Sequence, residues 1–124
     1  MDVSYSRMTS ARRFRVVTVT TPNLTTARKL IQIVVEARFA ACGSLVPKIE
    51  SHYWWKGKLE RCTEVLVLFK TTSDNLKSLE KLILKNHPYD TPEIIALPLS
   101  NGNARYLDWI TGETVRETPK LKKR

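Results

Sequence analysis

Three side chains in this sequence have the chemistry of metal ligands: Cys42, His87 and Glu93. A thiolate is a soft ligand, a neutral imidazole suits Cu²⁺ or Zn²⁺, and a carboxylate supplies oxygen. Each also has a structural alternative, namely a small buried cysteine, a histidine at a helix C-terminus and a solvated carboxylate. The other histidine, His52, is expected to face solvent. The residue types permit a metal site without defining one.

A second set of six aromatic and basic side chains could line a pocket for a small anion or metabolite. The six are Tyr53, Trp55, Lys70, Tyr89, Tyr106 and Trp109. Because aromatic residues dominate buried contacts, packing between subunits is their alternative role. Lys70 fits packing least well, since a buried amine needs a partner.

Residues 49–72 are predicted to form a long β-hairpin that organises the rest of the chain. The two strands meet at Lys56–Gly57, where glycine adopts a positive φ at little cost. Valine and leucine alternate through residues 65–68, so both faces of the second strand are apolar. A chain of 124 residues can cover one face with its own helices. We therefore expect other copies of the chain to cover the second face.

The remaining pattern predicts an α+β domain. Strands are expected at 14–20, 44–55, 58–71 and 93–99, and helices at 24–39, 74–87 and 104–110. This order predicts a ferredoxin-like βαββαβ sandwich, with an antiparallel four-stranded sheet, helices on one face and an additional C-terminal helix. Pro47 predicts an edge strand or a bulge, because proline cannot donate to a sheet. Asn23, Asn103 and either Ser73 or Asp74 are the expected helix N-caps.

The charge is concentrated at the two ends of the chain. The net charge is +9, of which residues 1–15 and 113–124 carry +3 each. We expect a basic tail at 1–13, one domain at 14–113 and a second basic tail at 114–124. Charged tails alone carry no base-reading chemistry, so we expect them to aid solubility and consider nucleic acid an unlikely partner.

The cysteines and the hydropathy bear on the compartment. Cys42 and Cys62 are twenty residues apart without a CxxC spacing, which favours a reducing compartment and argues against a zinc knuckle. No apolar run approaches the ~20 residues of a membrane span, so no membrane partner is expected. The expected location is cytoplasmic. Residues 4–15 are rich in arginine and serine and also read as a transit peptide, which leaves an organellar location open.

Six motifs, in order, resemble the CutA family of divalent-cation tolerance proteins. The motifs are TPN, ARFAACGSLVPKI, SHYWWKGKLE, EVLVLFKT, HPYDTPEIIALP and YLDWI, within residues 16–110. The resemblance implies a ferredoxin-like protomer and a homotrimer joined through the hairpin. It implies binding of Cu²⁺ or another divalent metal, with no organic cofactor and no established reaction. It further implies that the six aromatic and basic residues named above line clefts between protomers.

This chain departs from the copper-binding members that it resembles. Those members have a cysteine near the end of the first strand, where this chain reads TVTTPN, and some have a histidine at the position of Asn86. Any copper site should therefore centre on His87, with Cys42 and Glu93 as further ligands. We expect a binding protein rather than an enzyme.

Three other functions compete with metal binding. A trimeric scaffold that binds a small molecule or a partner protein remains open. An RNA-binding module would use Tyr53, Trp54 and Trp55, but these crowd beside a turn instead of occupying central strands. An acylphosphatase-like enzyme would need a glycine-rich phosphate cradle after the first strand, where residues 20–23 contain no glycine.

Overall fold

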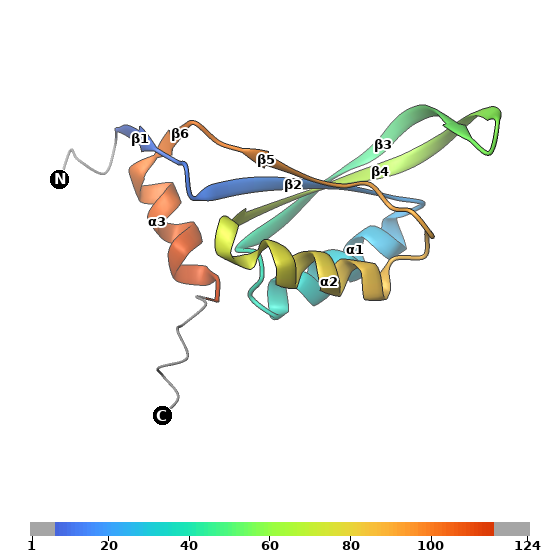
Figure 1. The fold of residues 1–124 in the computed structure, drawn as a ribbon. Helices are drawn as coiled ribbons and strands as arrows, with labels where there is room; N and C mark the ends of the chain where they lie inside the picture. Colours follow the sequence, from blue (N-terminus) through green and yellow to red (C-terminus); the bar gives the residue numbers. More distant parts are fainter. Residues whose placement is uncertain (1–6, 116–124) are drawn as a thin grey trace.

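The structure is a computed structural model that describes residues 7–115. Its main sheet is antiparallel, with the strand order β3-β4-β2-β5. Helices α1 and α2 both lie on one face of this sheet (Figure 1). The elements are β1 Met8–Ser10, β2 Phe14–Thr21, α1 Leu24–Glu36, β3 Cys42–Trp55, β4 Lys58–Thr72, α2 Leu76–Asn86, β5 Ile94–Pro98, β6 Asn101–Asn103 and α3 Ala104–Glu113. The predicted ferredoxin-like fold with a C-terminal helix is confirmed.

The main core fills the space between the sheet and the two helices. It consists of Val17, Val19, Ala27, Leu30, Val34, Ala40, Val65, Val67, Phe69, Leu79 and Ile83. Helix α1 starts where predicted, because the Asn23 side chain accepts a hydrogen bond from the backbone N–H of Thr26 at 2.8 Å. It ends at Glu36, and the φ of 64° at Arg38 then lets the N–H of Phe39 donate back to Val34 O at 3.2 Å.

The predicted hairpin is formed by β3 and β4. Lys56 and Gly57 have φ values of 49° and 79°, the signature of a type I′ turn. Strand β3 lies at the edge of the sheet, and its register shifts between Val46 and Ile49, so Pro47 is accommodated by both an edge position and a bulge. The tip of the hairpin projects beyond the helices (Figure 1).

A small second sheet extends the fold at its N-terminal end. Strand β1 pairs antiparallel with β6, Met8 facing Asn103. Beneath them, Ala11 and Phe14 pack with two buried residues of α3 in a second core. The prediction that residues 1–13 form a tail thus disagrees with the structure from Met8 onward, where the chain forms β1 and then enters the second core. A strand of three residues is too short to show a periodic pattern. Residues 1–6 and 116–124, which belong to the two expected tails, lie outside the described residues.

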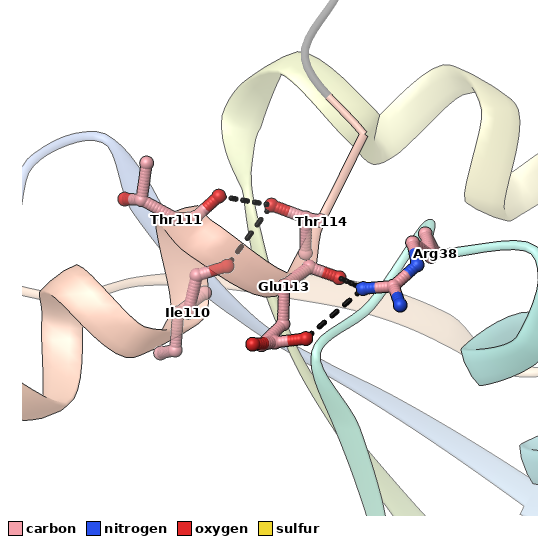
Figure 2. A network of polar contacts seen from close by, with 5 residues as sticks. All are labelled: Arg38, Ile110, Thr111, Glu113 and Thr114. Atoms are coloured by element: carbon pink, nitrogen blue, oxygen red, sulfur yellow. Dashed lines mark hydrogen bonds and ion pairs between the residues drawn. The ribbon is translucent and has the colours of Figure 1, made fainter.

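The C-terminal end of α3 is fastened to the loop that follows α1 (Figure 2). Arg38 Nη1 donates to Glu113 Oε1 at 3.0 Å and to Glu113 O at 3.3 Å. The N–H of Val115 donates to Arg38 O at 2.8 Å, and the buried hydroxyl of Thr114 donates to Ile110 O at 3.0 Å. The ion pair itself is exposed and contributes little stability. The backbone bond and the buried hydroxyl hold α3 in place.

The start of α2 differs from the prediction. A 3₁₀ turn, Ser73–Asn75, precedes the helix, and neither Ser73 nor Asp74 caps it. The buried Asn75 side chain instead donates to Thr72 Oγ1 at 2.8 Å and to Val115 O at 2.9 Å. At this position the chain forms a long-range hydrogen bond, from Asn75 to Val115, in place of a local helix cap. None of the helices within residues 7–115 is long and apolar enough to cross a membrane.

Candidate functional site

A cavity lies between the outer half of the hairpin and the loop that joins α2 to β5. Its volume is about 710 Å³. Five elements contribute to its wall: β2, β3, β4, the loop after α2 and the residue before β5. In that order, the side chains that matter most are Thr20, Tyr53 and Trp55, Glu64, Tyr89 and Glu93. The cavity combines aromatic walls with three carboxylates, those of Glu64, Asp90 and Glu93.

Glu64 is the most unusual residue of this cavity, because its carboxylate is buried with only 6% of the residue exposed. One oxygen, Oε2, accepts a hydrogen bond from the Tyr89 hydroxyl at 2.8 Å. Burial, and then the bond to the Glu64 carboxylate, raise the pKa of Tyr89 well above its usual value, so Tyr89 stays protonated as the donor. Within residues 7–115, Glu64 has no ion pair. A buried carboxylate with no cation beside it is costly, which makes this position a candidate for binding a positively charged group.

Glu93 is the second carboxylate at the cavity. It directly precedes β5, whose first residue, Ile94, pairs with Val19. Its Oε2 accepts a hydrogen bond from Thr18 Oγ1 at 2.8 Å. Within residues 7–115 the other carboxylate oxygen makes no hydrogen bond or ion pair, so Glu93 can offer it to a ligand.

His87 holds the loop that carries Tyr89. The backbone N–H of Tyr89 donates to His87 Nδ1 at 3.0 Å, so Nδ1 carries no proton. The other nitrogen, Nε2, is 2.8 Å from Thr20 O, which only accepts, so Nε2 carries the proton and donates. With 9% of the residue exposed and both nitrogens bonded, His87 has a structural role here. It does not fit a metal ligand in this arrangement.

Cys42 lies at the opposite end of the sheet, next to α3. Its sulfur is 4.0 Å from the Tyr106 hydroxyl, and the Tyr106 ring stacks on Trp109 with 5.6 Å between centroids. Burial is the main cause that raises the pKa of Tyr106, with a further contribution from Cys42. Lys70, which pairs with Cys42 across the strands, donates to Ser44 Oγ at 3.3 Å. Lys70 therefore has the partner that its half-buried position requires.

The three expected metal ligands are not brought together. Cys42 pairs with Lys70, whereas Thr20, the partner of His87, pairs with Leu66. Lys70 and Leu66 are four residues apart on β4, so Cys42 and Thr20 are separated by roughly 13 Å along the strand direction. Within residues 7–115, no group of three or more His, Cys, Asp or Glu side chains is arranged to hold a metal ion. The six expected cleft residues also separate into two sets, with Tyr53, Trp55 and Tyr89 at the cavity and Lys70, Tyr106 and Trp109 at the other end.

Sequence reasoning missed Glu64 and Asp90, which line the cavity, and Cys62, which lies beside it. Glu64 carries the buried charge, and Cys62 contacts the Tyr53 hydroxyl at 3.5 Å. That bond, then burial, raise the pKa of Tyr53 to about 12. The alternation of β4 contained a signal for Glu64. An acid in phase with Leu66 and Leu68 belongs to the face that was expected to be covered by other copies.

Comparison with known proteins places the chain in a family. The profile of the CutA1 divalent ion tolerance protein family matches residues 15–113, and the chain belongs to that family. Over 99 residues it is 42% identical to Protein CutA 1, chloroplastic, of rice, covering 80% of this chain and 56% of the relative. It is 41% identical over 99 residues to the divalent-cation tolerance protein CutA of Thermus thermophilus, covering 80% and 96%.

The fold comparison agrees with the family assignment. The structure of CutA from Synechococcus elongatus superposes with a TM-score of 0.85 at 32% identity, covering 90% of this chain and 99% of that one. The chain spans about half the length of several curated relatives that it matches, such as the rice protein at 56% and the mouse Protein CutA at 52%. The common part is the ferredoxin-like domain.

Proposed function

We propose that this chain binds divalent cations as a homotrimer, with the cation held by the carboxylates of the cavity between the hairpin and the α2–β5 loop. The buried carboxylate of Glu64 carries the proposal, because within the described chain it has one hydrogen bond and no cation. Glu93 supplies a second carboxylate on the same wall. The family name, divalent ion tolerance protein, supports cations as the ligand class.

The donor set favours a hard cation over copper. Carboxylate and hydroxyl oxygens suit Mg²⁺, Mn²⁺ and Ca²⁺, whereas copper prefers nitrogen and sulfur ligands. His87 would have to release either the Tyr89 N–H or Thr20 O before its ring could bind copper. Cys42 lies at the other end of the sheet. The expected copper site centred on His87 is therefore kept as the second candidate, after a hard-cation site at the carboxylates.

The outer face of the sheet supports assembly. Leu66 and Leu68 are only half-buried, and Val46, Ile95 and Leu97 are 41%, 51% and 45% exposed. These side chains lie on the face opposite the helices, where Thr18 and Thr20 of β2 lie between the residues of β4 and β5. A half-exposed face with this many apolar side chains is typically covered by another subunit. The number three comes from the resemblance to the CutA family. A neighbouring copy would also approach Glu64, which shares this face.

Calorimetric titration of the purified protein with Mn²⁺, Mg²⁺, Zn²⁺ and Cu²⁺ tests the cation site. Glu64→Gln and Glu93→Gln should each weaken Mn²⁺ binding at least tenfold, because each removes a negative oxygen ligand. Glu36→Gln, an exposed acid on α1, is the matched control and should leave binding unchanged. Binding of no divalent cation, or equal binding by all four proteins, would contradict the proposal. Copper binding that is lost only in His87→Gln would instead support the copper site centred on His87.

The mass in solution tests the assembly independently. Light scattering at micromolar concentration should give three times the chain mass of 14.3 kDa. A monomer would contradict the trimer. The expected cytoplasmic location and the absence of catalysis stay predictions, and the name of the rice relative places that protein in the chloroplast.

A further inference from the structure

The cavity gathers negative charge and aromatic surface in a chain whose net charge is +9. Three carboxylates line it, and none of the described residues that line it is Lys or Arg. The bond to Cys62 and then burial raise the pKa of Tyr53, burial raises that of Tyr89, and the charge of Glu64 adds to both increases. The walls therefore favour a ligand that combines positive charge with an apolar part.

Two basic side chains near the cavity leave its carboxylates unneutralised. The Nζ of Lys56 is 5.7 Å from the centre of the Trp55 ring, and His52 Nε2 is 2.7 Å from Glu50 Oε2. Within the described part of the chain, none of the three carboxylates of the cavity forms an ion pair. Because Lys56 already contacts Trp55, the rings of Tyr53 and Tyr89 are the aromatic surfaces left for a ligand.

Glu64 and Glu93 approach the cavity from two different strands. Glu64 belongs to β4, Glu93 directly precedes β5, and β2 lies between these strands. Two strand spacings separate the two backbones by roughly 10 Å. Each carboxylate is also held by its own partner, Glu64 by the Tyr89 hydroxyl and Glu93 by Thr18. A single ion would have to draw the two side chains together, whereas a ligand with a positive group at each end can meet both.

The size of the cavity also fits an organic molecule. Its volume of about 710 Å³ lies within the range of roughly 300–1,000 Å³ that is usual for small-molecule pockets. A bare cation needs far less space, because its oxygen ligands lie within about 2.6 Å of it. Within residues 7–115, no three His, Cys, Asp or Glu side chains are grouped tightly enough to hold a metal ion. Volume and ligand spacing thus favour an extended cation.

We propose that the ligand of this cavity is a linear aliphatic amine with an ammonium group at each end. One ammonium group donates to Glu64 and the other to Glu93. The methylene chain between them lies against the rings of Tyr53 and Tyr89, which also attract the positive charge. Alkyl amines are protonated at neutral pH, as the lysine side chain is. The inference rests on the proposed cation site and assigns an organic cation to it.

Calorimetric titration of the full-length protein with 1,6-diaminohexane, n-hexylamine and 1,6-hexanediol tests the proposal. The three probes share one carbon chain and carry two, one and no ammonium groups. The diamine should bind about tenfold more tightly than the monoamine, because only the diamine forms a second hydrogen bond between charged groups. The diol should show no binding. This comparison uses the unchanged protein and does not depend on the folding of a variant.

Substitutions assign the two ends and the chain of the ligand. Glu64→Gln and Glu93→Gln should each abolish the preference for the diamine over the monoamine. Tyr53→Leu should weaken diamine binding about threefold, whereas Tyr53→Phe, which keeps the ring, should not. Glu36→Gln, which removes an exposed acid of α1, is the matched control and should keep the full preference. Light scattering should give the same mass for all these proteins.

Three results would overturn the inference. The first is no diamine binding by the unchanged protein, which is also expected if a neighbouring copy fills the cavity. The second is equal binding of the diamine and the monoamine. The third is an unchanged preference in both Glu64→Gln and Glu93→Gln, which would assign amine binding to other acids of the chain.

Titration of the same samples with Mn²⁺ separates this inference from the proposed function. Binding of Mn²⁺ without binding of the diamine would overturn the inference and leave the metal site standing. Binding of the diamine without binding of any metal ion would support the inference and contradict the metal site. Binding of both, with each ligand weakening the other, would place them in the same cavity.

Discussion

The two faces of the central sheet have similar sequences and opposite surroundings. On the inner face of β4, Val67 and Phe69 are fully buried under the helices. On the outer face, Leu66 and Leu68 occupy the alternate positions and remain half-buried, and the exposed Ile95 and Leu97 of β5 lie on the same face beyond β2. The chain covers the inner face with its own helices and leaves the outer face partly exposed. Glu64 and the other polar groups of the cavity belong to this outer face.

If the proposed assembly uses the outer face, one strand serves folding and assembly at once. A strand with apolar residues on only one face would contribute to the core of its own subunit and to nothing else. Because side chains alternate, β4 adds a second apolar surface without any change in backbone. The buried charge of Glu64 then lies where a second copy or a cation can approach it. The inner face is covered by the helices of the same chain, whereas the outer face remains available to the proposed cation and to further copies.

Lysine substitutions at neighbouring positions of β4 should separate these two roles. Val67→Lys places an unpaired charge in the closed core and should cost about 3–5 kcal/mol of unfolding free energy, enough to unfold many domains of this size. Leu68→Lys lies on the outer face and should leave the fold of the subunit intact while it disrupts the oligomer. Circular dichroism and light scattering measure the two effects.

Leu97→Lys, on β5 of the same outer face, is the matched test of the second effect. It should also give a folded monomer. If Leu68→Lys unfolds the chain as fully as Val67→Lys does, the outer face belongs to the subunit core and the comparison fails. If neither outer-face variant changes the mass, the assembly uses another surface.

The two ends of the outer face can be compared through their tyrosines. Tyr89→Phe removes the hydrogen bond to the buried Glu64 and should cost about 1–3 kcal/mol, because the carboxylate loses its donor. Tyr106→Phe removes only a long contact to Cys42, 4.0 Å between the heavy atoms, and should change stability by less than about 0.5 kcal/mol. Urea unfolding of both proteins measures the difference. Equal effects would show that the cavity end is no more constrained than the α3 end.

Alkaline pH should act on the same bond. The pKa of Tyr89 is raised in the folded state, first by burial and then by Glu64. Above the usual tyrosine pKa of about 10, the unfolded chain loses this proton while the folded chain keeps it, so stability falls as the pH rises. Below that pH the contribution is fully present. The fall should be smaller in Tyr89→Phe than in the unchanged protein, measured by urea unfolding across this range.

Much of the fold follows from sequence periodicity, and much of the site does not. Strong patterns such as the apolar stripe of α1 and the alternation of β4 predicted their elements with small shifts at the ends. The β1–β6 pair escaped prediction because it depends on two distant segments of three residues each. His87 has the residue type of a ligand, but its two hydrogen bonds come from Tyr89 and Thr20, and no local pattern shows the second of these.

Helix caps show the same limit on a smaller scale, and they give the last prediction. Asn103 caps α3, its Oδ1 accepting from the Tyr106 N–H at 3.1 Å, as the sequence predicts. Ser73 is an equally good candidate by residue type, but it makes no capping bond because the chain enters α2 through a 3₁₀ turn. Asn103→Ala should therefore cost about 1 kcal/mol, whereas Ser73→Ala should cost only a few tenths. Thermal unfolding of the two variants decides between them, and an equal loss would mean that residue type alone governs capping here, whatever the backbone around it does.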